Sequence, residues 1–165
     1  GDWATDRLIP DMVKAAVLQK SVFIRNKLAT RPWQHVLEPL SGYLTLGWQL
    51  LKGNQEFADG WNFGPSLNSN LTVDEIVKLA YSEWNAITVE YSENKTDIHE
   101  ANLLMLDCSK ANKILKWNAV WDIHKTIHKT ISWYKQFYTS QSVQTQHDIA
   151  DFILDARKQN AIWTR

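Results

Sequence analysis

Residues 31–53 read Arg-Pro-Trp-Gln-His-Val-Leu-Glu-Pro-Leu-Ser-Gly-Tyr-Leu-Thr-Leu-Gly-Trp-Gln-Leu-Leu-Lys-Gly and carry the pattern that decides the fold class. Large apolar and polar residues alternate over residues 33–37, which predicts a short strand. Pro39 suits the first turn of a helix, and Gly53 suits its end. Between them the apolar positions recur at helical spacing, at Leu40, Tyr43, Leu44, Gly47, Trp48 and Leu51. A short strand leading into a longer helix indicates a mixed fold.

Helical patterns continue on both sides of this stretch. An apolar stripe starts at Ile9, with Pro10 tolerated in the first turn of that helix. Thr72 is followed three residues later by Glu75, which is the pattern of a capping box at the start of a helix. Further helices are predicted up to Leu115, over a long segment after residue 117, and around residues 149–156.

Strand patterns are short and fewer. Residues 21–24 and 87–91 are rich in β-forming residues, residues 103–106 form a third short run, and residues 61–63 are a possible fourth. Helix outweighs strand throughout the chain. The sequence therefore predicts an α+β fold that is mainly helical with short strands.

The composition limits the class of protein. With 165 residues, 44% of them hydrophobic and 22% charged, the chain can bury the core of one domain. Eighteen Lys plus Arg balance eighteen Asp plus Glu, so the long-range field of a nucleic-acid binder is absent. The sequence contains neither a signal-peptide pattern nor an apolar run long enough for a membrane span. Cys108 is the single cysteine, so we expect a reducing, cytoplasmic setting.

Signatures of self-contained catalysis are missing. The chain has no Gly-x-Gly-x-x-Gly, no P-loop, no Gly-x-Ser-x-Gly and no paired cysteines, so we assign it no catalytic residue and no cofactor or metal site. His124 and His128 are spaced to share a metal on a helix, but a third ligand is not evident. A solvated helix edge is the preferred interpretation, and Cys108 is interpreted as a packed residue.

Nine tryptophans and a basic loop are the remaining candidates for binding. Trp48, Trp84 and Trp117 lie on apolar helix faces or at element ends and are expected in the core, whereas Trp3 has no evident role. Arg25, Lys27 and Arg31 lie within seven residues of one another. The planar fork of arginine suits phosphate or carboxylate, although a solvated basic loop is the alternative.

The segment 31–44 resembles the stretch that distinguishes CDP-glucose 4,6-dehydratases within the extended short-chain dehydrogenase/reductase superfamily. Other segments resemble the same family in the same order, and the resemblance covers about residues 1–138. Lys116 departs from the family pattern, which has glycine before Trp117. Because residue 1 is Gly and runs directly into a patterned segment, we expect the amino terminus to be a cut. The segments that carry the resemblance are 1–11, 31–44, 61–65, 99–102, 106–111, 115–117 and 130–134.

The resemblance implies a lyase of deoxysugar biosynthesis. In this family bound NAD oxidises the sugar at C4, water leaves across C5 and C6, and the hydride returns to C6. The NAD-binding and acid-base groups lie in the N-terminal half, which the present residues do not resemble. Residues 1–165 are therefore expected to be a single partial domain, the C-terminal substrate-binding half, inactive without the N-terminal NAD-binding domain.

The resemblance also implies roles for particular residues. Arg31 corresponds to an arginine that pairs with the diphosphate of the nucleotide sugar. Arg7 and Leu8 would lie near the diphosphate and base. Ile24 and Arg25 would flank the base or ribose.

A further residue and the expected partners follow from the same resemblance. Glu100 would accept hydrogen bonds from ribose hydroxyls. The expected partners are a CDP-sugar and the missing N-terminal domain, and an exposed edge around residues 61–64 would allow a homo-oligomer. The alternative is a non-catalytic module, derived from such an enzyme, that binds a nucleotide sugar or a protein.

Overall fold

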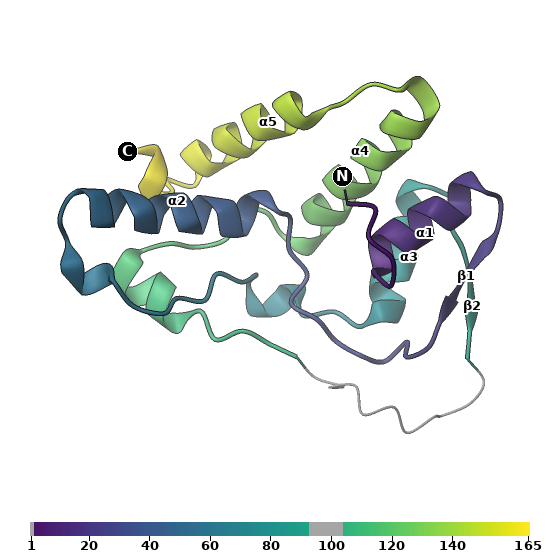
Figure 1. The fold of residues 1–165 in the computed structure, drawn as a ribbon, viewed down its shortest axis with the longest axis horizontal. Helices are drawn as coiled ribbons and strands as arrows, with labels where there is room; N and C mark the ends of the chain where they lie inside the picture. Colours follow the sequence, from purple (N-terminus) through teal and green to yellow (C-terminus); the bar gives the residue numbers. More distant parts are fainter. Residues whose placement is uncertain (1, 93–103) are drawn as a thin grey trace. The chain divides into compact units, whose positions relative to one another are not determined.

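The computed structural model describes residues 2–92 and 104–165, which form two compact units (Figure 1). Unit 1 consists of Gly1–Arg31, Leu71–Leu104 and Ile127–Thr145, and unit 2 of Pro32–Asn70, Met105–Thr126 and Gln146–Arg165. The mainly helical α+β class is confirmed, since the strands of the described residues form one two-stranded sheet. None of the helices within the described ranges combines the length and apolarity needed to cross a bilayer. The expectation of a single partial domain stays a prediction.

Unit 1 is built on a parallel pair of strands. β1 (Ser21–Ile24) pairs with β2 (Thr88–Tyr91) in a register that aligns Ser21 with Thr88 and Ile24 with Tyr91. Both strands were predicted within one residue of their observed bounds. Because the strands are parallel, their carboxyl ends lie at the same edge of the sheet.

Helix α1 (Leu8–Val17) precedes β1 and lies beside it (Figure 1). Its buried face is Met12, Val13 and Ala16, as the helical spacing predicts. A tight turn joins α1 to β1, in which the Lys20 backbone N–H donates to the Ala15 carbonyl at 2.9 Å. The helix and strand therefore run in opposite directions, and the start of α1 lies at the same end of unit 1 as the carboxyl end of β1.

Helix α3 (Val73–Glu83) begins with the predicted capping box. The Thr72 hydroxyl accepts from the Glu75 backbone N–H, and the Glu75 carboxylate accepts from the Thr72 backbone N–H at 2.8 Å. Burial of Ile76, Val77 and Ala80 fixes the face that packs inward. This helix returns to β2 through a short turn after Trp84.

Helix α4 (Ile123–Ser140) completes unit 1 with its residues from Ile127 onward. Trp3 packs against it, with ring centroids 5.9 Å from Trp133 and 5.3 Å from Phe137, and its indole donates to the Tyr138 hydroxyl at 2.8 Å. The Tyr134 hydroxyl donates to the Asp2 carbonyl at 2.6 Å. Trp3, without a role in the sequence, therefore anchors the first residues to α4.

Unit 2 has a helical framework with irregular connections. Its core has two buried aromatic groups, one around Phe63 and Trp117 and one around Trp121 and Phe152. The π-helix η3 carries Lys116 after its last residue in the left-handed conformation, at φ 57°. Glycine suits such a backbone best. The elements of this unit are α2 (Leu37–Leu51), the short helices η1 (Gln55–Phe57), η2 (Leu67–Ser69) and η4 (Ile162–Thr164), the π-helix η3 (Ala111–Leu115) and α5 (Thr145–Lys158).

Three of the predicted strands are wrong. Residues 33–36 form no strand, and α2 begins at Leu37 rather than at Pro39. Residues 61–63 and 104–106 are also irregular, and residue 103 lies outside the described residues. Side chains hold these segments in place of a ladder: the Gln34 amide donates to the Phe63 carbonyl at 3.0 Å, and the Asn62 amide donates to the Asp107 carbonyl at 3.1 Å. Period-two alternation makes a strand only where a neighbouring backbone completes the ladder.

The apolar stripe of α2 faces away from unit 2. Trp48, expected in the core, is 59% exposed, whereas Trp84 and Trp117 are buried as expected. The buried positions of the helix are Glu38, Ser41, Gly42 and Thr45. The spacing identified the stripe correctly but could not show which side of the helix the rest of the unit occupies.

Candidate functional site

The loop that carries Arg31 is fixed to the start of α3. The Val73 backbone N–H donates to the Ala29 carbonyl at 2.9 Å, and the Asp74 N–H donates to the Lys27 carbonyl at 3.0 Å. Thr30 forms an isolated antiparallel bridge with Thr72. The loop carbonyls thus satisfy amide groups that the first turn of a helix leaves unpaired. The backbone of the basic loop is thus fixed within unit 1, while Arg25 and Lys27 stay exposed.

Arg31 itself is half-buried, and its guanidinium donates to the Thr30 carbonyl at 2.8 Å. Holding the side chain through its own backbone reduces the entropy lost when an anion binds. Its chemistry and its fixed position suit a phosphate or carboxylate.

Lys27 and Tyr91 add a second charged group at the carboxyl end of β2. The Lys27 ammonium lies 5.4 Å from the centre of the Tyr91 ring. The Tyr91 hydroxyl donates to the Asp74 carboxylate at 2.8 Å, and Lys78 pairs with the same carboxylate at 2.7 Å. Lys78 and then Tyr91 lower the pKa of Asp74, so that this carboxylate stays ionised. Burial, reinforced by Asp74, raises the pKa of Tyr91 to about 12, which keeps the phenol protonated.

Ile24 and Arg25 lie where β1 ends. Ile24 is buried, and its carbonyl accepts from the Ser92 backbone N–H at 3.0 Å, which extends the sheet beyond Tyr91. Arg25 is exposed immediately after it. The side chain of Ile24 therefore packs inside unit 1, whereas the positive charge of the neighbouring Arg25 is exposed.

Arg7 and Leu8 lie at the start of α1. Arg7 is exposed, and its backbone N–H donates to the Asp11 carboxylate at 3.1 Å. Leu8 is half-buried as the first residue of the helix. Since α1 runs opposite to β1, both residues lie at the end of unit 1 that also carries Ile24 and Arg25.

One end of unit 1 therefore collects the described candidates. The bond from Tyr91 to Asp74 places the first turn of α3 at the carboxyl end of β2, and Thr72 brings Thr30 and the neighbouring Arg31 to the same turn. In open α/β sheets, ligands bind beyond the carboxyl ends of the strands. Glu100 lies outside the described residues. No local pattern predicts the bond between Tyr91 and Asp74, because the two residues lie 17 positions apart in the chain.

The alternative that His124 and His128 share a metal finds no third ligand among the described residues. His128 pairs with Glu83 at 2.9 Å, and no group of three metal-ligating side chains occurs in residues 2–92 and 104–165. Cys108 is half-buried, and desolvation raises the pKa of its thiol. A raised pKa keeps the thiol protonated and poorly nucleophilic, consistent with a packed residue.

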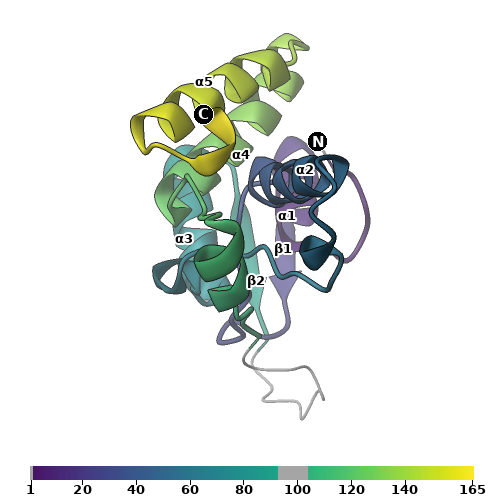
Figure 2. The same ribbon diagram turned by 90° about the vertical axis from the view of Figure 1, so that its left-hand side faces the viewer.

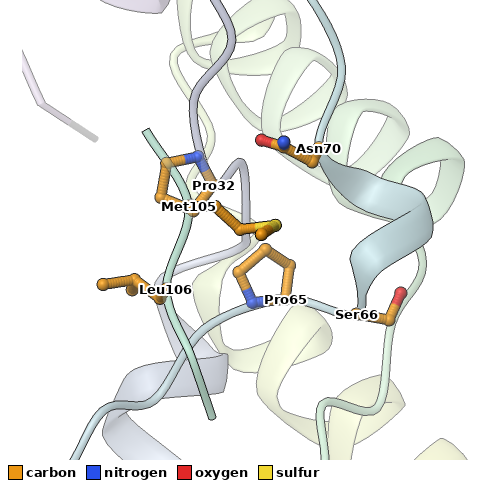
Figure 3. Close-up of a pocket in the computed structure, with 6 residues that line it drawn as sticks. All are labelled: Pro32, Pro65, Ser66, Asn70, Met105 and Leu106. Carbon is orange, nitrogen blue, oxygen red and sulfur yellow. The ribbon is translucent and has the colours of Figure 1, made fainter. Parts of the chain in front are cut away.

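A small pocket lies within unit 2 (Figure 3). In the close-up the Met105 side chain points toward Pro65. The cavity volume is about 10 Å³, room for roughly one water molecule and far too little for a nucleotide. The lining residues are Pro32, Pro65, Ser66, Asn70, Met105 and Leu106.

Comparison with known proteins identifies the relatives of this chain. It is 38% identical over 155 residues to CDP-glucose 4,6-dehydratase of Salmonella typhimurium, an alignment that covers 93% of the chain and 43% of the relative. A UDP-glucose 4-epimerase of Mycoplasma pneumoniae is 21% identical over 142 residues, with 81% of the chain and 41% of the relative covered. The chain belongs to the family of nucleotide-sugar dehydratases and epimerases. It spans less than half the length of these relatives.

A solved structure shows a similar fold. The UDP-N-acetylglucosamine 4-epimerase of Bacillus cereus superposes with a TM-score of 0.57 at 17% identity, covering 80% of the chain and 44% of that structure. No protein-family model matches the sequence. Both relatives are named for enzymes that act on nucleotide sugars.

Proposed function

We propose that this chain is the substrate-binding part of a CDP-glucose 4,6-dehydratase, which converts CDP-glucose to CDP-4-keto-6-deoxyglucose and water. The single observation that carries the proposal is the 38% identity to a CDP-glucose 4,6-dehydratase over 93% of the chain. The cation-lined end of unit 1 supports it, because a diphosphate carries the charge that this end is suited to receive.

Arg31 is the proposed contact to the diphosphate. Its guanidinium is half-buried in a loop that two backbone hydrogen bonds fix to α3, so the cation is held in place before any ligand arrives. Arg7 and Leu8 are proposed to lie along the diphosphate and base. Ile24 and Arg25 are proposed beside the base or ribose, with Arg25 as the exposed member of that pair. Glu100 remains the proposed acceptor for the ribose hydroxyls.

The chain's own residues do not fit the NAD that the family uses. A dinucleotide site needs a glycine-rich turn from a strand to a helix. After β1 the next glycine is Gly42, within α2, and no glycine follows β2 anywhere in the sequence. NAD binding is therefore assigned to the part of the relatives without a counterpart in these 165 residues.

The same observation favours a second candidate for the chain by itself. Without a dinucleotide turn, these residues would act as a non-catalytic module that binds a nucleotide sugar. Both candidates use the Arg31 site, but only in the first is the chain part of an enzyme that converts the bound nucleotide sugar. In either case we propose a CDP-sugar ligand, no nucleic-acid partner and a cytoplasmic setting.

Titration with CDP-glucose tests the substrate site. The 165-residue chain is titrated by calorimetry, or by NMR if affinity is weak, as wild type and as Arg31→Ala, Arg31→Lys and Arg157→Ala. Arg31→Ala is expected to abolish binding and Arg31→Lys to weaken it, because lysine keeps the charge but lacks the bidentate fork. Arg157, an exposed arginine of α5, is the control and should bind as wild type.

Thermal melts of each variant separate loss of the site from loss of the fold. A folded Arg31→Ala variant that binds CDP-glucose with unchanged affinity would remove Arg31 from the site. UDP-glucose and dTDP-glucose in the same titration report whether the base is distinguished.

A further inference from the structure

The side chain of Tyr91, the last residue of β2, meets the loop that carries Arg31 in two ways. Its ring lies beneath Lys27 of that loop, with the ammonium 5.4 Å from the centre of the ring. Its hydroxyl donates to the Asp74 carboxylate in the first turn of α3 at 2.8 Å. Figure 2 shows β1 and β2 side by side with α3 next to them. Tyr91 therefore links the sheet of unit 1 to both the loop and the helix.

The first turn of α3 holds the same loop through its backbone. The Asp74 N–H donates to the Lys27 carbonyl at 3.0 Å, and the Val73 N–H donates to the Ala29 carbonyl at 2.9 Å. Asp74 thus accepts from Tyr91 with its side chain and donates to the loop with its main chain. A shift of Asp74 would therefore be passed directly to the loop.

The bond between Tyr91 and Asp74 is the firmer of the two that reach this carboxylate. Lys78 also pairs with Asp74, but the Lys78 side chain is 71% exposed, and exposed ion pairs fix a side chain only weakly. Tyr91 is half-buried at the end of β2. The pKa of Asp74 is lowered and that of Tyr91 is raised to about 12, so an ionised acceptor faces a protonated donor. A hydrogen bond to an ionised acceptor is stronger than one between neutral groups.

We propose that Tyr91 is a positioning residue for Arg31. Acting through Asp74 and Lys27, it holds the loop in the conformation in which the guanidinium receives the diphosphate of a nucleotide sugar. This inference rests on the proposed function, and it does not require Tyr91 to contact the ligand. A loop that is held in its binding conformation loses less conformational freedom when the ligand arrives, which increases the affinity.

Titration of the 165-residue chain with CDP-glucose tests the role of the hydroxyl. Tyr91→Phe keeps the ring beneath Lys27 and removes only the donor to Asp74. We expect this variant to bind CDP-glucose about fivefold more weakly, the size of effect seen for residues that act on a site without contacting its ligand. Tyr81→Phe, at a 54% exposed tyrosine of α3, is the matched control and should bind as wild type. Thermal melts of both variants report whether the fold is kept.

Variants of Asp74 test whether the bond itself carries the effect. Asp74→Ala should weaken binding as much as Tyr91→Phe does, whereas Asp74→Asn should keep most of the affinity, because its amide oxygen still accepts from the tyrosine. The double variant Tyr91→Phe and Asp74→Ala should bind no more weakly than either single variant, since the two residues act through one bond. Fully additive losses would show that they act independently and would reject the proposed route.

An Arg31→Lys background separates positioning from a general loss of structure. Lysine lacks the planar fork that the loop orients, so Tyr91→Phe should there change the affinity by less than about twofold. A fivefold loss in both backgrounds would show that Tyr91 does not act through Arg31.

The titrations also distinguish failure of this inference from failure of the proposed function. If wild type binds CDP-glucose and both Tyr91→Phe and Asp74→Ala bind it equally well, the positioning role is rejected while the substrate site stands. If wild type binds no CDP-glucose, the proposed function is rejected and the positioning role is rejected with it.

Discussion

At the scale of single residues, Glu38 is the most consequential buried group. It is fully buried at the start of α2, and its two carboxylate oxygens accept from consecutive backbone N–H groups of the segment after Trp117. Desolvation raises the pKa of Glu38 to about 7 from its ordinary 4.5, against the lowering effect of the bonds from Trp121 and Val120. Burial therefore outweighs the two hydrogen bonds.

The raised pKa of Glu38 makes the stability of the fold depend on pH. A group whose pKa is higher in the folded state contributes stability that is present below its unfolded value, here 4.5, and lost as pH rises to about 7. The change is up to about 3.5 kcal/mol at 1.4 kcal/mol per pKa unit. Urea unfolding of wild type and Glu38→Gln between these two pH values should show the decline in the wild type alone. Parallel curves would show that Glu38 does not control this dependence.

At the scale of elements, a close contact between Gly42 and the Phe63 ring fixes the position of α2. The Cβ of any larger residue at Gly42 would collide with the Phe63 ring, which lies 5.0 Å from the Trp117 ring between centroids. The tight contact explains why a glycine stands at this position, while Leu37 and Leu46 of the same helix pack against the two aromatic clusters of the core.

The two mid-helix glycines of α2 should respond oppositely to a methyl group. Gly42→Ala is expected to cost about 1–3 kcal/mol, because it overpacks the contact with Phe63. Gly47→Ala, at a position with open space around it, should stabilise the chain by roughly 0.5–1 kcal/mol through helix propensity. Chemical denaturation of both variants measures the change in the free energy of unfolding that each substitution causes. A tolerated Gly42→Ala would contradict the close approach of α2 to Phe63.

At the scale of the whole molecule, the sequence contains no glycine-rich turn of the kind that binds a dinucleotide. Neither strand leads into a glycine-containing turn, and the balanced charge leaves only local electrostatic sites such as the end of unit 1. A dehydratase must position an acid and a base at the sugar as well as a hydride acceptor. We propose that those groups belong to the part of the relatives that has no counterpart in these 165 residues.

The 165-residue chain is accordingly expected to give no turnover of CDP-glucose, even with NAD added. Chromatography of the nucleotide sugars after incubation measures this, with the full-length Salmonella dehydratase as the positive control. NAD-dependent appearance of a 4-keto sugar nucleotide from the chain alone would contradict the prediction and assign catalysis to these residues.

Local sequence was sufficient where the determining contacts are close in the chain. The capping box at Thr72, the helix from Leu8 and the strand Ser21–Ile24 were predicted because each depends on residues a few positions apart. The resemblance of residues 31–44 likewise indicated the family that the comparisons support. For the candidate site, the sequence supplied the residues, and the structure then placed the five described ones at one end of unit 1.

Tertiary structure decided what depends on distant partners. The alternation predicted over residues 33–37 became a loop over residues 33–36, because no strand adjoins it among the described residues. The stripe of α2 faces outward because Phe63 and Trp117 lie against the other side of the helix. Likewise, the hydroxyl of Tyr91 meets Asp74 only after α3 folds back on β2. Periodicity in a sequence determines which residues share a face, whereas long-range packing determines which face is buried.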